Sequence, residues 1–210
     1  MVPEVNWPQA IQPLLKLYKG KKHPLNYDNL YQLLVVVVLS AQDSDRHINK
    51  IAPSLFNAFP DMAALSKAST ADLLPYLSGV RNFGNKIQWL LGMAQQLKQD
   101  DNIPLTHDGL TALKGIGSKS ANVILREAGK PPEGIIVDLH VVRVAPRLGM
   151  VTEKKDPKKI EKQLKALLPQ EDWDIGMALS FLGREICRPV PQCERCLMNK
   201  VCTYYLSIAQ

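Results

Sequence analysis

The sequence predicts an all-helical protein, and three observations support that prediction. Apolar residues recur at intervals of three and four along much of the chain, the alternation typical of a strand is rare, and capping residues flank the apolar stripes. Asp, Ser or Thr before a stripe and Pro or Gly after it are the usual boundaries of helices. The chain has 210 residues, 46% of them hydrophobic, which suffices for one good core or two small ones.

The first strongly apolar segment, residues 33–39, reads Leu-Leu-Val-Val-Val-Val-Leu and has high strand propensity. Taken alone, it would be a buried strand. An isolated strand has no pairing partner in this sequence, so we predict a helix that is buried on all sides.

Two later stripes predict amphipathic helices, one within residues 87–97 and one within residues 160–168. The second overlaps a lysine-rich stretch, residues 154–165, which invites interpretation as a DNA-binding surface. The lysines lie opposite the apolar stripe and alternate with acidic residues, so we favour an ordinary solvated helix face. The apolar positions of the two stripes are Ile87, Leu90, Leu91, Ala94 and Leu97, and Ile160, Leu164, Leu167 and Leu168.

The charge balance permits a polyanionic partner without requiring one. There are 26 basic and 20 acidic residues, which gives a net charge of +6. The first residues, Met-Val-Pro-Glu, begin no signal or transit peptide, and no apolar run has the length of a membrane span. We therefore expect a cytoplasmic protein that keeps its thiols reduced and does not bind a membrane.

Four cysteines near the end of the sequence, spaced C-x5-C-x2-C-x5-C, are the strongest single motif. Thiolates are soft ligands, and four on a short loop suit either zinc or an iron–sulfur cluster. Spacing alone favours neither metal centre over the other. Disulfides are disfavoured, because no secretory segment is present and the cysteines are clustered. The four are Cys187, Cys193, Cys196 and Cys202.

A Gly-x-Gly turn, Gly115 and Gly117, precedes a helix that we expect to begin at about Ser118. Such a turn lets backbone N–H groups point outward at a helix N-terminus, where they can bind a phosphate. Gly-x-Gly is a weak signal by itself, and a plain interhelical turn is the alternative.

Two residues are candidates for catalysis. Lys119 would lie in the first turn of the helix after the glycines, where the helix dipole should lower the pKa of its amine and favour a nucleophile. Asp138 follows three apolar residues and could place a carboxylate beside an electron-poor sugar. The alternatives are a surface lysine and an ordinary helix N-cap, and an N-cap carboxylate can still face a cleft.

Three motifs of this sequence, in the order in which that family has them, resemble the endonuclease III family of DNA glycosylases. They are residues 113–123, residues 137–144 and the four-cysteine loop, with further matches at residues 39–42, Asp45, residues 49–50 and Gly183-Arg184. The similarity runs from about His23 to Tyr205, which is nearly the whole chain.

The resemblance implies two helical domains with a DNA-binding cleft between them. Residues 23–133 would form a six-helix barrel domain that carries the helix–hairpin–helix. Residues 1–22 together with 134–210 would form a second domain, in which the four cysteines hold a 4Fe–4S cluster. Duplex DNA would lie across the cleft with the damaged nucleotide flipped out of the stack.

Residue roles follow from the same resemblance. Lys119 matches the family's nucleophile, which attacks C1′ of the sugar, and Asp138 matches its catalytic carboxylate. Gln42 matches the residue that fills the gap opposite the flipped base, and Asn82 falls at the wedge position, where the family often has leucine. The remaining expected DNA contacts are Gly115, Gly117, His140 and Arg184.

The function implied is a bifunctional glycosylase that removes oxidised pyrimidines and cuts the abasic site by β-elimination through a lysine Schiff base, that is, a DNA-(apurinic or apyrimidinic site) lyase. Its partner would be double-stranded DNA with damaged bases or abasic sites, and the protein would act as a monomer at the bacterial nucleoid. Two alternatives remain: a monofunctional glycosylase for mismatched or damaged bases, and a non-catalytic DNA-binding homologue.

Overall fold

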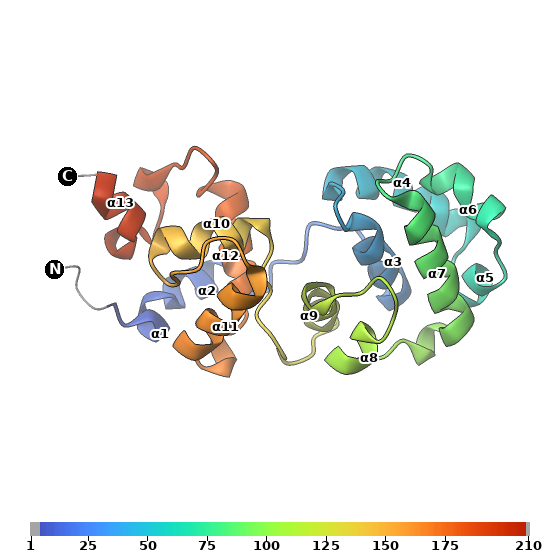
Figure 1. The fold of residues 1–210 in the computed structure, drawn as a ribbon, viewed down its shortest axis with the longest axis horizontal. Helices are drawn as coiled ribbons and strands as arrows, with labels where there is room; N and C mark the ends of the chain where they lie inside the picture. The colour runs from blue at the N-terminus through green and yellow to red at the C-terminus, as the bar shows by residue number, and fades with distance from the viewer. Residues whose placement is uncertain (1–4, 209–210) are drawn as a thin grey trace. The chain divides into compact units, whose positions relative to one another are not determined.

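The structure, a computed structural model, describes residues 5–208, and no residue in that range lies in a β-strand. The prediction of an all-helical protein is confirmed. The chain divides into two compact units: one contains Lys22–Pro131, and the other combines the segment up to Lys21 with the chain from Pro132 onward (Figure 1).

The unit from Lys22 to Pro131 is organised around α3 (Leu30–Ser40). Residues 33–39 are all buried, at most 3% exposed, so the prediction of a helix buried on all sides is confirmed. Asn29 begins this helix by accepting a hydrogen bond from the backbone N–H of Gln32 at 2.9 Å. Helices α4, α7 and α9 pack directly against α3, which explains why a segment with strand propensity stays helical.

The other helices of this unit surround α3 or extend from its neighbours. The helices α5 and α6 pack on α7, and α8 packs on α9. Their bounds are α4 (Asp45–Ala58), α5 (Met62–Ser66), α6 (Thr70–Leu77), α7 (Phe83–Leu97), α8 (His107–Thr111) and α9 (Ser118–Glu127), with a 3-10 turn η1 (Asp100–Asn102) between α7 and α8.

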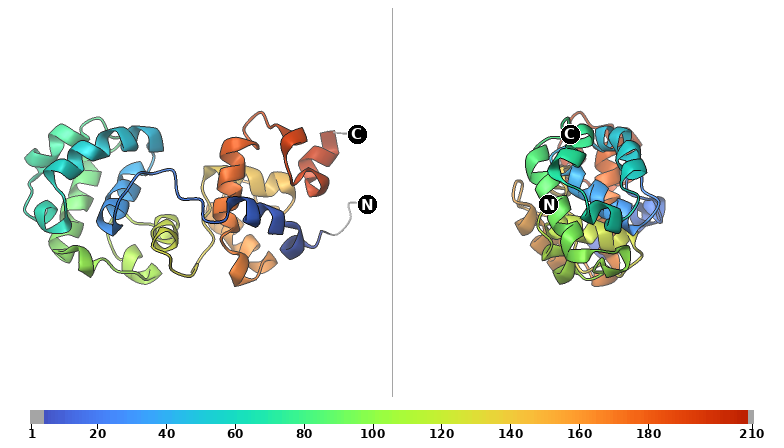
Figure 2. Two further views of the ribbon diagram at one scale, coloured as in Figure 1. Left: turned by 180° about the vertical axis from the view of Figure 1, so that it is seen from behind. Right: turned by 90° about the vertical axis from the view of Figure 1, so that its right-hand side faces the viewer.

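The unit that contains both ends of the chain is built on the pair α10 (Leu139–Leu148) and α12 (Ile175–Glu185), which pack together along their lengths. The N-terminal helix α2 (Gln12–Tyr18) packs on α12, and the left view of Figure 2 shows the blue N-terminal segment beside the orange helices. The remaining elements are α1 (Trp7–Ala10), α11 (Pro157–Leu167), α13 (Thr203–Ile208), η2 (Gln170–Asp172), η3 (Cys193–Arg195) and η4 (Asn199–Val201).

Helix α11 tests the interpretation of the lysine-rich stretch. Ile160 and Leu164 are buried, whereas Lys158, Lys159 and Lys162 are exposed. These lysines therefore lie on the exposed face of α11, and the preference for a solvated face over a DNA-binding surface stays a prediction.

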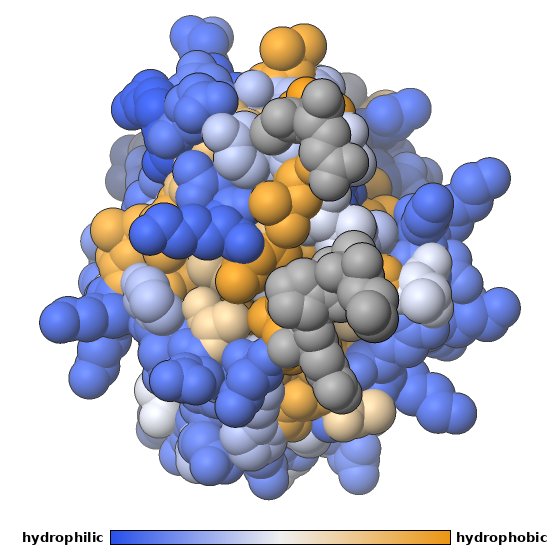
Figure 3. Space-filling view, turned by 90° about the vertical axis from the view of Figure 1, so that its left-hand side faces the viewer, coloured by the Kyte–Doolittle hydropathy of each residue, from blue (hydrophilic) through white to orange (hydrophobic). Residues whose placement is uncertain are grey.

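The surface is mixed, and the face drawn in Figure 3 carries mainly hydrophilic side chains with apolar patches between them. Among the described helices, none has both the length and the apolar character needed to cross a membrane.

Candidate functional site

The hairpin that links α8 to α9 depends on a glycine at its tightest point. Gly115 has a φ of +96°, and a Cβ placed there would lie 2.7 Å from Cε3 of Trp89. Gly117 directly precedes α9 in an extended conformation and offers no side-chain cap to the helix. His107 fastens the hairpin through a contact of 3.0 Å between its Nε2 and the Oγ of Ser118. The predicted two-glycine turn and the helix start at Ser118 are both confirmed.

Lys119 is the second residue of α9 and is exposed. The opposite face of the same helix is buried through Ala121, Ile124 and Leu125. The helix is therefore anchored by its apolar face, and the amine is presented at the positive end of the helix dipole.

Asp138 forms the N-cap of α10. Its Oδ1 accepts hydrogen bonds from the backbone N–H groups of His140 at 2.8 Å and Val141 at 2.9 Å. These bonds satisfy two of the donors that an α-helix leaves unpaired at its start. The prediction that Asp138 caps a helix is confirmed, and the side chain is 14% exposed.

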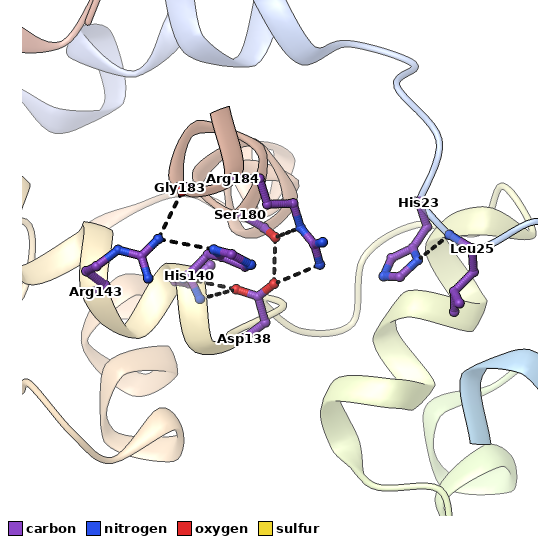
Figure 4. A network of polar contacts seen from close by, with 9 residues as sticks. His23, Leu25, Asp138, His140, Arg143, Ser180, Gly183 and Arg184 are labelled. Carbon is purple, nitrogen blue, oxygen red and sulfur yellow. Dashed lines mark hydrogen bonds and ion pairs between the residues drawn. The ribbon is translucent and has the colours of Figure 1, made fainter. Parts of the chain in front are cut away.

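The second carboxylate oxygen of Asp138 faces α12 (Figure 4). Ser180 donates its hydroxyl to Oδ2 at 2.6 Å, and Nη2 of Arg184 lies 3.8 Å from the same oxygen. Nε of Arg184 in turn donates to Oγ of Ser180 at 3.4 Å. Because an ionised carboxylate is acceptor-only, this set of donors favours the charged form and fixes its orientation.

Two glycines explain how Ser180, which is fully buried, comes so close to Asp138. Gly176 and Gly183 lie on the same face of α12 as Ser180, four residues before it and three after it. A Cβ at Gly183 would lie 2.7 Å from Cβ of His140, and one at Gly176 would clash with the backbone of Ile136. The small residues let α12 approach the segment that carries Asp138.

His140 and Arg143 extend this network toward the cysteine loop. Nη2 of Arg143 lies 3.1 Å from Nδ1 of His140 and donates to the carbonyl of Gly183 at 2.9 Å, and its Nε donates to the carbonyl of Cys187 at 3.0 Å. A guanidinium is a donor only, so Nδ1 of His140 accepts and the ring proton lies on Nε2.

The four cysteines follow α12 and are free thiols. Together they line one cavity, whose other walls include Leu148, Leu182, Ile186 and Pro191. Burial raises the pKa of Cys193, Cys196 and Cys202, and neighbouring thiols contribute in the same direction. Within the described residues, no three His, Cys, Asp or Glu side chains converge closely enough to hold a single metal ion.

Arg147 holds the beginning of the cysteine loop against α10. Its guanidinium donates to the carbonyl of Arg188 at 2.7 Å and to that of Pro189 at 3.1 Å, and Nη1 lies 3.7 Å from Sγ of Cys187. The loop is therefore attached to the same helix that Asp138 caps.

Gln42 and Asn82 lie on two exposed turns of the other unit, after α3 and before α7. Both have left-handed backbone conformations, with φ of +60° and +58°. Their turns are joined by Asp43, whose Oδ2 accepts the backbone N–H of Arg81 at 3.0 Å, and by Lys86, which reaches the end of α3.

Sequence reasoning missed Ser180, Asp43 and Lys86. A serine within an apolar helix carries no signal by itself, although the spacing of Gly176, Ser180 and Gly183 marks one small-residue face. A lysine within a helix is normally solvated, and nothing in the sequence marked Lys86, at 1% exposed, as buried.

Comparisons with known proteins show which family the chain resembles. Residues 35–170 match the model of the HhH-GPD superfamily of base excision DNA repair proteins. The chain is 35% identical over 193 residues to endonuclease III of Synechocystis sp., which covers 90% of this chain and 88% of that protein. It is 29% identical over 206 residues to endonuclease III of Escherichia coli strain K12, which covers 95% and 97% of the two chains.

Solved structures give the same result. A non-covalent endonuclease III–DNA complex matches with a TM-score of 0.84 and 28% identity, over 98% of this chain and 99% of that chain. A trapped endonuclease III–DNA covalent intermediate matches with a TM-score of 0.85 and 28% identity, over 99% of this chain and 100% of that chain.

Proposed function

Because this chain belongs to the HhH-GPD superfamily of base excision DNA repair proteins, and within it to the endonuclease III family, we propose that it is a bifunctional DNA glycosylase and abasic-site lyase. Its substrate would be double-stranded DNA that contains oxidised pyrimidines or abasic sites. The observation that carries the proposal is the exposed Lys119 in the first turn of α9, directly after the glycine hairpin. Support also comes from the relative that was trapped as a covalent intermediate with DNA.

Lys119 would act as the nucleophile. Its Nζ forms a bond to C1′ of the damaged nucleotide while the bond between C1′ and the base breaks, and the base leaves with the bonding electrons and takes up a proton. The attached nitrogen gives up one proton, the bond between C1′ and O4′ breaks as the sugar ring opens, and O4′ takes up a proton, which leaves a protonated Schiff base between Nζ and C1′. Removal of a proton from C2′ then expels the 3′ phosphate and cuts the strand.

Asp138 would act as the negative charge that this reaction needs. Positive charge develops on the sugar as the base leaves, and a preoriented carboxylate stabilises it without reorganising. Ser180 would hold the carboxylate in place, since its hydroxyl occupies Oδ2 at 2.6 Å. The carboxylate could rotate only by losing the two hydrogen bonds that Oδ1 accepts from the backbone N–H groups of His140 and Val141.

The proposed DNA contacts fall into two groups. Gly115 and Gly117 would present backbone N–H groups to a phosphate, which the absence of a side-chain cap on α9 supports. Gln42 would fill the gap opposite the flipped base and Asn82 would occupy the wedge position in the duplex. His140 and Arg184 would contact the strand near Asp138.

The proposed domains are residues 23–133 and residues 1–22 with 134–210. The division of the chain into two compact units supports them. The protein would act as a monomer on nucleoid DNA in the cytoplasm.

Cys187, Cys193, Cys196 and Cys202 would hold a 4Fe–4S cluster. Four thiols around one cavity are a suitable soft donor set for an iron–sulfur cluster. When bound, the cluster would supply cross-links that fix the loop. Cys196→Ala is expected to lower the iron and sulfide content, the thermal stability and the DNA affinity together; a stable, active variant would contradict the structural role.

Borohydride trapping tests the function. Wild-type protein and Lys119→Gln would be incubated with a duplex that carries one thymine glycol, and a covalent complex is expected from the wild type alone. Base release without a covalent complex would instead indicate a monofunctional glycosylase. Binding without base release across a panel of lesions would indicate a non-catalytic homologue.

A further inference from the structure

Two residues of the unit from Lys22 to Pro131 have unusual backbone conformations at exposed turns. Gln42 has a φ of +60° and Asn82 a φ of +58°, and among residues 5–208 only Lys98 joins them as a non-glycine residue with positive φ. Such conformations persist only where the surrounding structure holds them, and they concentrate at functional sites. The contacts that hold these two turns are therefore informative.

Lys86 holds the turn of Gln42 from within the protein. Its Nζ donates to the carbonyls of Leu39 and Ala41, each at 2.7 Å, and the residue is 1% exposed. These carbonyls belong to the end of α3, where the helix dipole favours a cation. Burial lowers the pKa of Lys86, while the nearby charge of Asp43 acts in the opposite direction.

Asp43 joins the two turns directly. Its Oδ2 accepts the backbone N–H of Arg81 at 3.0 Å, and its Oδ1 accepts the backbone N–H of Ser44 at 2.7 Å and lies 2.9 Å from Nδ1 of His47. Burial raises the pKa of Asp43, but these hydrogen bonds outweigh it and hold the pKa below its usual value. The residue after Gln42 is thereby bonded to the residue before Asn82.

The contacts close a ring. The backbone N–H of Lys86 donates to the carbonyl of Asn82 at 3.2 Å, and its side chain returns to Ala41, the residue before Gln42. Each left-handed residue is therefore fixed from both sides, while the side chains of Gln42 and Asn82 remain exposed. If Lys86 served only to cap the C-terminus of α3, neither the hydrogen bond between Asp43 and Arg81 nor the link to the turn of Asn82 would be needed.

We infer that Lys86 and Asp43 form a brace that positions Gln42 and Asn82 together for entry into the duplex at a damaged site. The inference rests on the proposed function, in which those two residues contact DNA. Fixing both turns before binding lowers the ordering cost of the bound state, so the brace should contribute to discrimination between damaged and intact DNA. Lys86 and Asp43 are positioning residues, since neither needs to touch the substrate.

The test measures affinity for a duplex with a tetrahydrofuran abasic analogue and for the same duplex intact. Asp43→Ala and Lys86→Met are each expected to lower the ratio of the two affinities by about tenfold, and to leave binding to the intact duplex unchanged. Asp72→Ala is the matched control, because it removes a carboxylate from the capping box of α6 on the same unit. It should lower stability and leave the affinity ratio at the wild-type value.

A double-mutant cycle shows whether the brace acts through the two turns. In a Gln42→Ala, Asn82→Ala background, Asp43→Ala should change the ratio by less than about twofold. An unchanged ratio in the Asp43 and Lys86 single variants, or a full tenfold loss in that background, would overturn the inference. If Lys86→Met does not fold, the affinity ratios of Asp43→Ala and Asp43→Asn decide whether the inference holds. A wild-type protein that fails to discriminate would instead count against the proposed function.

Discussion

Helices α9 and α10 begin in opposite ways. The N-terminus of α10 is capped by the carboxylate of Asp138, which accepts two backbone N–H groups through one oxygen. The N-terminus of α9 follows Gly117 and has no side-chain cap. In α10 the protein satisfies its own helix end with a fixed negative charge, whereas the start of α9 has no such side chain, and under the proposed function it would face a DNA phosphate beside the exposed Lys119.

Under the proposed function, the difference suits two distinct tasks, one for Asp138 and one for Lys119. A carboxylate that must stabilise a developing charge benefits from being held rigidly, and Asp138 is held by groups from α10 and α12. An amine that must reach a sugar benefits from exposure and from an adjacent phosphate site. Variants that remove the amine, neutralise the carboxylate or introduce a cap on α9 test this difference between the two helix starts.

The largest effect is expected from Lys119→Gln. Without an amine no Schiff base forms, and base release and strand cutting should each fall by more than about 1,000-fold in single-turnover assays. Lys114→Gln removes an exposed lysine from the same hairpin and serves as the matched control. It should retain the rates and weaken DNA binding only a few-fold, with a smaller salt dependence. Equal losses in both variants would mean that the hairpin needs charge and not a nucleophile.

Asp138→Asn should have the next largest effect. The amide oxygen can still cap α10, so the melting temperature should change little, while the loss of charge should slow base release on the order of 100-fold. Asp156→Asn is the control, because Asp156 caps α11 by accepting the N–H groups of Lys158 and Lys159. A similar rate loss in the Asp156 variant would show that capping, and not the charge at residue 138, matters for the rate.

Gly117→Asp would give α9 the kind of cap that α10 has. Gly117 is extended, and apart from its chain neighbours no residue lies within 4 Å of a Cβ placed there, so the substitution fits. The cap should stabilise the protein by about 1 kcal/mol, while its charge should lower DNA affinity on the order of tenfold. Thermal unfolding and DNA titration check the two changes, and Gly117→Asn separates the cap from the charge. Higher affinity in Gly117→Asp would contradict an anion site at this helix end.

Ser180→Ala should have the smallest effect of the series. Loss of one hydrogen bond to the carboxylate corresponds to about 1 kcal/mol, or about fivefold in base release, with KM unchanged. If the serine acts only through Asp138, the same substitution in an Asp138→Ala background should have no further effect. Ser66→Ala, in which a hydroxyl that donates to the carbonyl of Ala63 is lost, is a control outside the site. An effect on KM alone would assign Ser180 to DNA binding.

Local chemistry made much of this arrangement predictable. An aspartate before a helical stripe predicts a cap, and two closely spaced glycines predict a turn, so the positions of Asp138 and Lys119 on their helices follow from nearby residues. The apolar run of residues 33–39 could also be predicted to be a helix, because a lone strand has no pairing partner. In each case the determining interactions span only a few residues.

The missed residues depend on contacts between distant segments. Ser180 meets Asp138 only because Gly176 and Gly183 allow α12 to approach, and the two residues are 42 positions apart in the chain. The carbonyls that accept hydrogen bonds from Lys86 lie 45 and 47 residues away in the chain. Neither pair of contacts produces a periodic or local pattern in the sequence. Both depend on tertiary packing and could not be predicted from nearby residues.

The central claim is that Lys119 is the group that forms the covalent bond to the sugar. The most direct measurement is to trap wild-type protein on a thymine-glycol duplex with borohydride, digest the complex, and identify the modified peptide by mass spectrometry. We predict a sugar adduct on Lys119 alone. An adduct on Lys114, on another lysine or on the N-terminal amine would contradict the claim.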